Sequence, residues 1–214
     1  MNSGRASERA AFELGTALIA VAGCVDAIGF LRLNHLFVSF MSGNSTQLAI
    51  ALVRGQHGKP GEVASIVALF VIGGVIGFAL LRLAGAWGRS AVIALDAALL
   101  ATAAALDRGN FASIIPVVLA MGVQNAAIRR VGETQTNLTY VTGTLVLMSQ
   151  KIVDAFSGPR TAWLPYAIMW FSMIVGAALG AMLYGTFGLR ALFLPAAAAA
   201  VLAILAWTEA RATA

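Results

Sequence analysis

Apolar residues in this chain come in long runs that short polar segments separate. Two of the runs, residues 63–83 and 163–187, are each long enough to cross the ~30 Å hydrocarbon core of a bilayer as a helix that rises ~1.5 Å per residue. The pattern predicts an all-α polytopic membrane protein, one compact helical bundle embedded in the lipid bilayer. Eight apolar segments can be distinguished along the chain: residues 11–31, 36–53, 62–83, 90–106, 110–128, 136–153, 161–187 and 190–207.

The composition agrees with this class and excludes several others. Charged residues make up 11% of the chain, against ~25% in a typical soluble protein. Hydrophobic residues make up 60%, and the mean hydropathy is +0.87. The formal charge is +5, but the 14 basic residues are spread over all the polar connectors. Such a distribution orients a protein in the membrane and is not typical of nucleic-acid binding.

Few side chains are suited to metal binding or to catalysis. The single cysteine, Cys24, excludes an intramolecular disulfide and a multi-thiolate metal site. His35 and His57 lie in polar connectors, away from carboxylates at ligand spacing. The sequence contains no nucleophile elbow, no zinc-protease motif and no phosphate-binding glycine loop. We therefore expect no metal, no cofactor and no enzymatic activity.

Two of the eight segments are unusually polar. Segment 36–53 carries Ser-Gly-Asn at residues 42–44, and segment 136–153 carries Thr-Gly-Thr at residues 142–144. If these segments are short and broken, six full spans remain and the two halves of the chain are inverted. If they cross, there are eight spans and the halves are parallel. The first alternative places one more basic residue inside, so the positive-inside rule slightly favours six full spans plus two short broken segments.

The two halves of the chain also resemble each other in three blocks. The blocks are residues 23–27 with 122–126 at an offset of 99, residues 40–44 with 140–144 at an offset of 100, and Gly73 and Gly77 with Gly176 and Gly180 at an offset of 103. Each match alone is expected by chance in a chain rich in Ala and Gly, but the three keep one order at nearly constant spacing. They predict two membrane repeats of about 100 residues, residues 1–107 and 108–214.

The two Gly-xxx-Gly pairs have a structural use of their own. Gly73 with Gly77 and Gly176 with Gly180 place small residues one helical turn apart. Such a pair forms a groove in which the backbone of another membrane helix can approach closely. The alternative is that glycine is simply common in membrane helices. We expect close helix packing at both pairs.

The two polar segments are the best candidates for a binding site. A glycine flanked by hydroxyl and amide groups can break a membrane helix, and the freed backbone groups are tolerated only inside the protein or beside water. Two related breaks would bring two polar half-helix ends together, as in many transporters. The alternative is that Ser and Thr bond back to their own helix carbonyls. The candidate substrate-binding residues are Asp26, Ser42, Gly43, Asn44, Thr46, Gln124, Asn125, Thr142, Gly143 and Thr144.

Asp26 and Asp96 are acidic residues inside predicted spans. A carboxylate at the bilayer centre costs roughly 2.5–3.5 kcal/mol, so it usually faces a partner or water. Asp26 either faces the break at Gly43, as a protonatable or cation-facing group, or pairs with Arg32 at the membrane surface. Asp96 is the weaker candidate, because Pro195 stands at its matching position in the second half.

Two motifs connect the chain with a known family. The stretch Asp-Ala-Ile-Gly-Phe-Leu begins at Asp26, and His-Leu-Phe-Val-Ser-Phe-Met-Ser-Gly-Asn-Ser-Thr follows at residues 35–46; a second block, Gly-Val-Gln-Asn to Thr-Gly-Thr, covers residues 122–144. Together they resemble the YoaK-like family of bacterial integral membrane proteins over essentially the whole chain. The resemblance implies a multi-pass protein of the bacterial inner membrane, but no function, because that family is uncharacterised. It carries over Asp26, Gly43, Asn44, Gln124, Asn125, Thr142, Gly143 and Thr144.

Two hypotheses from different classes follow. The leading one is a small-molecule or ion transporter, or permease, whose site lies between the two repeats. The alternative is a non-transporting membrane scaffold or assembly partner, whose glycine-rich faces pack against another protein. A homo-oligomer is compatible with both. The substrate, the coupling ion and the direction of transport are open at this stage.

Overall fold

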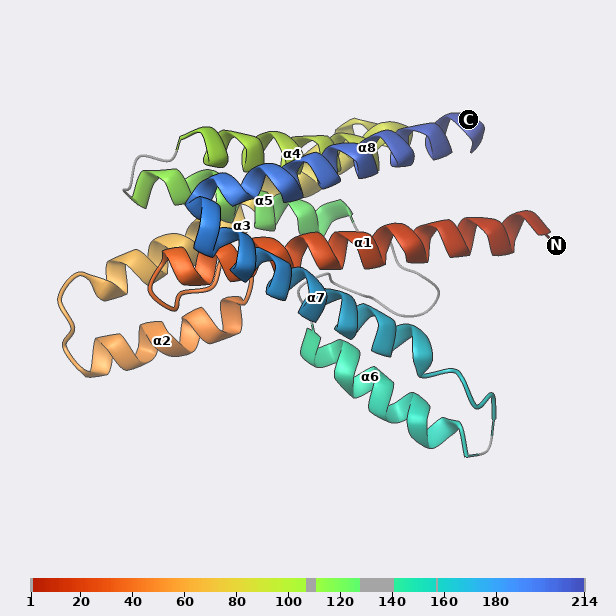
Figure 1. Ribbon diagram of the computed structural model, residues 1–214, viewed down its shortest axis with the longest axis horizontal. Coiled ribbons are helices and arrows are strands. Elements are labelled where there is room, and N and C mark those ends of the chain that lie inside the picture. The colour runs from red at the N-terminus through yellow and green to blue at the C-terminus, as the bar shows by residue number, and fades with distance from the viewer. Residues whose placement is uncertain (1, 107–110, 128–140, 157, 214) are drawn as a thin grey trace.

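The computed structural model describes residues 2–106, 111–127, 141–156 and 158–213. Within these ranges every regular element is a helix (Figure 1). The predicted all-α class is therefore confirmed. The α-helices are α1 (Asn2–Arg32), α2 (Met41–Val53), α3 (Lys59–Leu83), α4 (Gly88–Ala105), α5 (Ile115–Gln124), α6 (Val141–Asp154), α7 (Leu164–Phe187) and α8 (Phe193–Thr213). The short 3-10 helices are η1 (Gly85–Trp87), η2 (Phe111–Ile114), η3 (Asn125–Ala127) and η4 (Gly188–Leu192).

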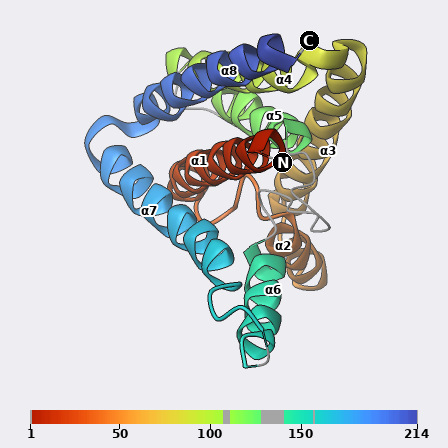
Figure 2. The ribbon, with the colours of Figure 1, turned by 90° about the vertical axis from the view of Figure 1, so that its right-hand side faces the viewer.

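Several stretches of the chain are long and apolar enough to cross a membrane. The longest of them has 48 residues and contains both α7 and α8, which Gly188 separates with a φ of 57°. This left-handed φ is open to glycine without steric cost, and the chain turns there (Figure 2). A shorter apolar helix, Ala112–Ala127, contains α5. The four long stretches are Arg9–Arg32, Lys59–Leu83, Gly85–Ala105 and Leu164–Arg211.

The local sequence explains where α3 begins and ends. Pro60 lies at the start of the helix, where its missing N–H costs nothing. Glu62 lies in the first turn and Arg82 in the last turn. These charges complement the positive N-terminal end and the negative C-terminal end of the helix dipole. The span therefore carries its charged residues at its two ends and apolar residues between them.

Helix α1 runs through the middle of the bundle (Figure 2), where it packs mainly on α7 and less extensively on α8. Leu18, Val25 and Ile28 of α1 are fully buried. Helices α4 and α8 lie side by side, and α7 packs along α1. The outward faces of α3 and α7 expose large apolar side chains such as Val75 and Phe171. An apolar outer face of this kind is what a membrane helix presents to lipid.

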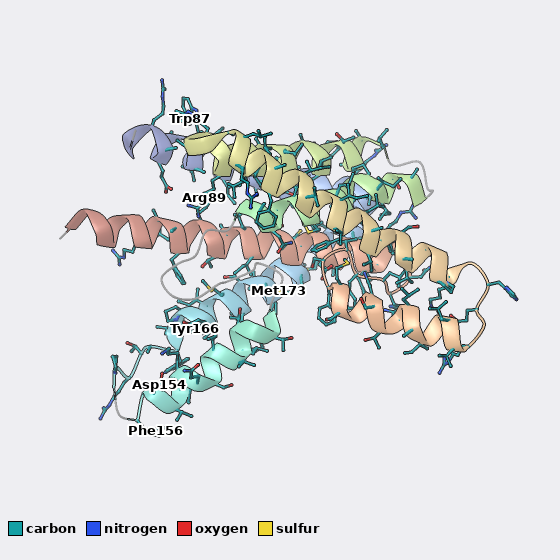
Figure 3. All side chains as sticks on the ribbon, turned by 180° about the vertical axis from the view of Figure 1, so that it is seen from behind. Trp87, Arg89, Asp154, Phe156, Tyr166 and Met173 are labelled. Carbon is teal, nitrogen blue, oxygen red and sulfur yellow. The ribbon has the colours of Figure 1, made fainter. Side chains whose placement is uncertain are left out.

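The helices α2 and α6 are too short to span a membrane. They have 13 and 14 residues, or roughly 20 Å of helix, against a hydrocarbon core of ~30 Å. Each begins near the middle of the molecule and runs outward, and the two run in opposite directions (Figure 1). Phe156 lies beyond the outer end of α6 (Figure 3). Segment 36–53 is thus not one helix across the membrane; in segment 136–153, residues 136–140 lie outside the part that the structure describes.

The break in the first polar segment lies before Gly43 and not at it. Gly43 is the third residue of α2, and Gly143 is the third residue of α6, so neither glycine interrupts a helix from within. The chain is not helical at Phe40, where φ is −87° and ψ is 74°. A Cβ on Gly43 would come within 2.5 Å of the Phe40 ring. The glycine therefore makes room for this ring at the start of the helix.

Candidate functional site

The segment between α1 and α2, residues 33–40, has an irregular conformation. The turn after α1 contains Asn34 and His35 with positive φ angles of 49° and 75°. Asn adopts this left-handed conformation readily, whereas in other residues it costs free energy that the surrounding contacts must offset. The backbone N–H of His35 donates to the carbonyl of Phe30 at 3.0 Å. Several of the candidate residues meet on this segment.

Asp26 anchors the segment to α1. Its Oδ1 accepts hydrogen bonds from the backbone N–H groups of Val38, at 3.0 Å, and Ser39, at 2.9 Å. Asp26 is only 6% exposed, so these two donors take the place of water around the carboxylate. The alternative partner, Arg32, has no hydrogen-bond partner for its Nε among the described residues. Asp26 therefore fixes the chain that leads into α2.

Asn44 anchors the same segment from the side of α2. Its Oδ1 accepts a hydrogen bond from the backbone N–H of Phe37 at 3.0 Å, and its Nδ2 donates to the Phe37 carbonyl at 2.7 Å. Asn44 is fully buried. The Nε2 of Gln47 adds a further bond, to the His35 carbonyl at 2.9 Å. One amide side chain thus satisfies both backbone groups of a residue that belongs to no helix.

Aromatic rings cover the anchored segment. The ring centroids of Phe30 and Phe37 lie 4.7 Å apart, and those of Phe37 and Phe40 lie 5.2 Å apart, the second pair edge to face. These separations are typical of favourable aromatic pairs. The hydrogen bonds of this segment to Asp26 are buried, and those to Asn44 are partly buried.

The hydroxyl groups of α2 differ in whether they bond back to carbonyls of the helix. The Oγ1 of Thr46 donates to the Ser42 carbonyl at 3.1 Å, and the Oγ of Ser45 donates to the Met41 carbonyl at 2.8 Å. Thr46 therefore bonds back to a carbonyl of its own helix, which is the alternative to a binding role for these hydroxyl groups. Ser42 is exposed in the first turn. The N–H groups of Met41 and Asn44 in this turn donate to the carbonyls of Ser39 and Phe40, whereas those of Ser42 and Gly43 lie where a helix offers no acceptor of its own. This end of α2 can donate hydrogen bonds to a polar solute.

The polar residues of α5 and η3 have different partners. Gln124 is buried, and its Nε2 donates to the carbonyl of Leu18 on α1 at 3.3 Å. The Nδ2 of Asn125 donates to the carbonyl of Met121, one turn earlier in the chain, in α5, at 2.7 Å. Gln124 is thus connected with α1, and the hydrogen bond of Asn125 to Met121 is local.

In α6, the first turn contains the remaining candidates. Thr142 is exposed, Gly143 is half-buried and Thr144 is buried. Residues 128–140, which lead into α6, lie outside the described part of the chain. The structure therefore brings Asp26 and Asn44 together on one segment and places the first turn of α6 at the inner end of that helix (Figure 1).

The partners of Asp26 and Asn44 were not predicted from the sequence. They are backbone groups of residues 37–39, and a backbone N–H leaves no signature in a sequence. The run at 37–40, Phe-Val-Ser-Phe, has the pattern of an apolar segment, so the sequence predicts a helix there. Gln47 also bonds to this segment, and its amide, one turn after Asn44, is the signal in the sequence that could have identified it. In the described ranges no group of three or more His, Cys, Asp or Glu side chains could hold a metal ion.

The helices and the buried polar anchors define a multi-pass α-helical membrane protein with an irregular segment inside the bundle. A family model described as "Protein of unknown function (DUF1275)" matches residues 14–205. The chain belongs to this family. It is 33% identical over 208 residues to the UPF0700 transmembrane protein RA0705 of Rhizobium meliloti (strain 1021), which covers 95% of this chain and 91% of the relative.

A second relative confirms the resemblance to the YoaK-like family. The UPF0700 transmembrane protein YoaK of Bacillus subtilis (strain 168) is 30% identical over 148 residues, or 63% of this chain and 64% of the relative. No solved structure matches the chain. The protein is thus a multi-pass transmembrane protein with bacterial homologues, and the names of these relatives state no activity.

Proposed function

We propose that this protein is a small permease of the bacterial plasma membrane, which moves a small molecule or an ion through a site between two inverted repeats. The repeats are residues 1–107 and 108–214, each with one short helix, α2 or α6, and three further apolar helices, of which α5 is the shortest. The boundary between them falls in residues 107–110, outside the described part of the chain. The observation that carries the proposal is a set of matching glycine contacts.

Glycines at two distant places make the same contact. On α7, Gly176 lies against the backbone carbonyl of Ala20 on α1. On α3, Gly73 lies against the backbone carbonyl of Leu119 on α5. The two glycines are separated by an offset of 103 and the two carbonyls by an offset of 99. These are the offsets that relate the repeats in the sequence.

Two more matched pairs of glycine contacts follow the same rule. In each matched pair of contacts, one partner is shifted by 103 residues and the other by 99. Chance matches would not keep both offsets in every pair, so the agreement supports a duplicated bundle. The glycines leave no room for a Cβ, and this lets the helix backbones approach closely in both places. The further pairs are Gly180 against Cys24 with its match Gly77 against Val123, and Gly23 against Met173 with its match Gly122 against Phe70.

The helix packing is reciprocal between the halves. Helix α1 of the first half packs on α7 of the second, and α5 of the second half packs on α3 of the first. Helices α4 and α8 pack on each other, as equivalent helices do when they meet on a two-fold axis. Because α2 and α6 run outward in opposite directions (Figure 1), the arrangement favours inverted repeats over parallel ones.

Inverted repeats with short helices that start inside the membrane are typical of secondary transporters, whose substrates bind near the midplane. Here the inner ends of α2 and α6 carry Ser42 and Thr142, both exposed. The first turn of a helix presents backbone N–H groups that can donate to a polar or negatively charged group of a solute. We assign binding to these two ends, and to Asp26 and Asn44 the task of holding one of them in place.

Solute binding and uptake test the proposal. Alanine, glucose, uridine and inorganic phosphate are suitable first probes, followed by a wider metabolite library. A solute that binds the folded state should raise the unfolding temperature, because at 100 times its Kd it adds about 2.7 kcal/mol of stability. Uptake of each binder into proteoliposomes then measures transport.

Alanine variants of the two exposed hydroxyl residues, compared with a control variant, test where the site lies. Ser42→Ala and Thr142→Ala should lower uptake without lowering the unfolding temperature. Ser65→Ala is the control, because Ser65 is exposed on α3 and its Oγ donates to the Gly61 carbonyl of its own helix at 2.7 Å. If no solute binds or enters although the protein is folded and inserted, the permease is excluded and the membrane scaffold becomes the better hypothesis.

A further inference from the structure

Asp96 is a carboxylate inside the bundle that the site described above does not use. It lies in α4, eight residues after Gly88, or about 12 Å along the helix axis. Trp87 and Arg89 mark the start of α4, at one end of the bundle (Figure 3). Asp96 is 0% exposed, and neither of its carboxylate oxygens has a hydrogen-bond partner among the described residues.

The surroundings of Asp96 are apolar. Val92, Ile93 and Ala97, its neighbours on the same helix, belong to a buried cluster with residues of α1, α5 and α8. Leu100, one turn further on, belongs to a second buried cluster. A carboxylate that is enclosed beside these apolar side chains and has no hydrogen-bond partner in the described part of the chain lacks compensation for the water it has lost.

No charged side chain hydrogen-bonds to Asp96 from the described parts of the elements around it. Helix α5 and the elements η1, η2 and η3 contain no titratable residue at all. The titratable residues of the other surrounding elements are Lys59, Glu62 and Arg82 on α3, Arg89 on α4, Arg190 on η4, Glu209 and Arg211 on α8, and Arg5, Glu8, Arg9, Glu13, Cys24, Asp26 and Arg32 on α1.

An unpartnered charge at this depth is unfavourable, and buried acids inside membranes usually belong to ion pathways or proton relays. A hard metal cation would need several oxygen ligands, whereas a proton needs only the carboxylate oxygen. We propose that Asp96 holds a proton while it is enclosed and couples the permease to the proton gradient. This inference rests on the function proposed above. In each cycle one carboxylate oxygen takes up a proton from water on one side and releases it to water on the other.

The contact between α4 and α8 allows the movement that this role requires. An open groove of about 830 Å³ runs along these helices and is lined mostly by alanines, among them Ala97 and Ala203. Trp87 and Trp207 line it as well, with ring centroids 5.9 Å apart. Small side chains interlock little, so α4 can slide along α8 as packed helices do in shear motions. Such a shift would admit water to Asp96.

Infrared spectroscopy of the protein in liposomes tests the protonated state without any solute. A protonated carboxyl group absorbs at higher frequency than the amide band, and the absorption shifts in heavy water. We expect this band at neutral pH in the wild type and its loss in Asp96→Asn. Asp154→Asn is the control, because Asp154 lies on the surface with Lys151 at 2.8 Å, and the band should persist there. A wild-type spectrum from which Asp96→Asn removes no such band overturns the proposal.

Proton movement tests the coupling. Liposomes with the pH-sensitive dye pyranine inside are placed in a more acidic medium, with alanine, glucose and uridine at equal concentrations on both sides. The wild type and Asp154→Asn should acidify the interior about tenfold faster than Asp96→Asn, as expected for loss of a proton relay. Equal rates for wild type and Asp96→Asn would overturn the coupling role while the permease stands. If no solute binds or enters the wild type, the permease fails, and the coupling role fails with it even where the infrared band is present.

Discussion

Replacing Gly180 by alanine should destabilise the protein, although alanine is the better helix former. In a helix interior alanine is favoured over glycine by about 0.5–1 kcal/mol. A Cβ at Gly180, however, would overlap the backbone carbonyl of Cys24 on α1, and this oxygen cannot move without its helix. Overpacking of this kind typically costs about 1–3 kcal/mol. We therefore expect a net loss of about 1–2 kcal/mol from these two opposing effects.

Gly77 should respond in the same way, because a Cβ there would lie 2.7 Å from a carbonyl oxygen of α5. Each test position has a control glycine on its own helix. An added Cβ at Gly185 of α7 meets no atom within 4 Å, and at Gly74 of α3 it meets only the Gly122 carbonyl, at 3.9 Å. Alanine at both control positions should be neutral or stabilising.

Thermal unfolding of the four purified variants measures this difference. For a chain of this length, 1 kcal/mol corresponds to about 2–4 °C in Tm. Gly77→Ala and Gly180→Ala should therefore melt about 2–8 °C below the wild type, and the two controls should not melt below it. Equal Tm values for test and control variants would refute the idea that glycine–carbonyl contacts hold the two helix pairs together.

Two further predictions concern the anchored segment. Asp26→Leu should leave the N–H groups of Val38 and Ser39 without an acceptor, at about 1–3 kcal/mol each, and amide hydrogen exchange there should speed up. Asp26→Asn keeps an acceptor oxygen and should change the exchange much less; similar exchange in both variants would exclude the anchor. Asn44→Ala should expose both backbone groups of Phe37 and lower the Tm, and an unchanged Tm would show that water replaces the amide without loss.

The membrane class could be predicted because it depends on length and hydropathy alone. The run that became α3 is longer than a bilayer core requires, and its charged residues, Lys59, Glu62 and Arg82, lie at its ends. No packing information is needed for that inference. The short helices were harder, because a polar segment with a central glycine is compatible both with a broken helix and with a full span.

Asp26 shows where sequence reasoning stopped. The residue was identified, and burial follows from its place in a span, but its partners are the backbone N–H groups of Val38 and Ser39. Backbone donors are present at every residue other than proline, so nothing in the sequence selects these two. The choice depends on how the chain turns at Asn34 and His35, which only the three-dimensional structure supplies.

The glycine pairs show the same limit in packing. Gly176 was recognised as a position for close helix approach, but a groove of small residues does not specify which helix enters it. Only the contact of Gly176 with Ala20 shows that α7 packs on α1 and not on a helix of its own half at this position. The offsets between the two halves can be read from the sequence, but only the contacts show which helices the matching glycines bring together.

Cysteine labelling in intact cells tests most directly whether the two halves are inverted. Cys24 is a free, buried thiol and can be replaced by alanine. Single cysteines then replace His57, in the turn between α2 and α3, or Thr161, between α6 and α7; both positions are exposed. Inverted repeats place these turns on opposite sides of the membrane, so a membrane-impermeant maleimide should label one cysteine in intact cells and the other only after permeabilisation. Labelling of both from the same side would contradict the inverted arrangement on which the proposed permease depends.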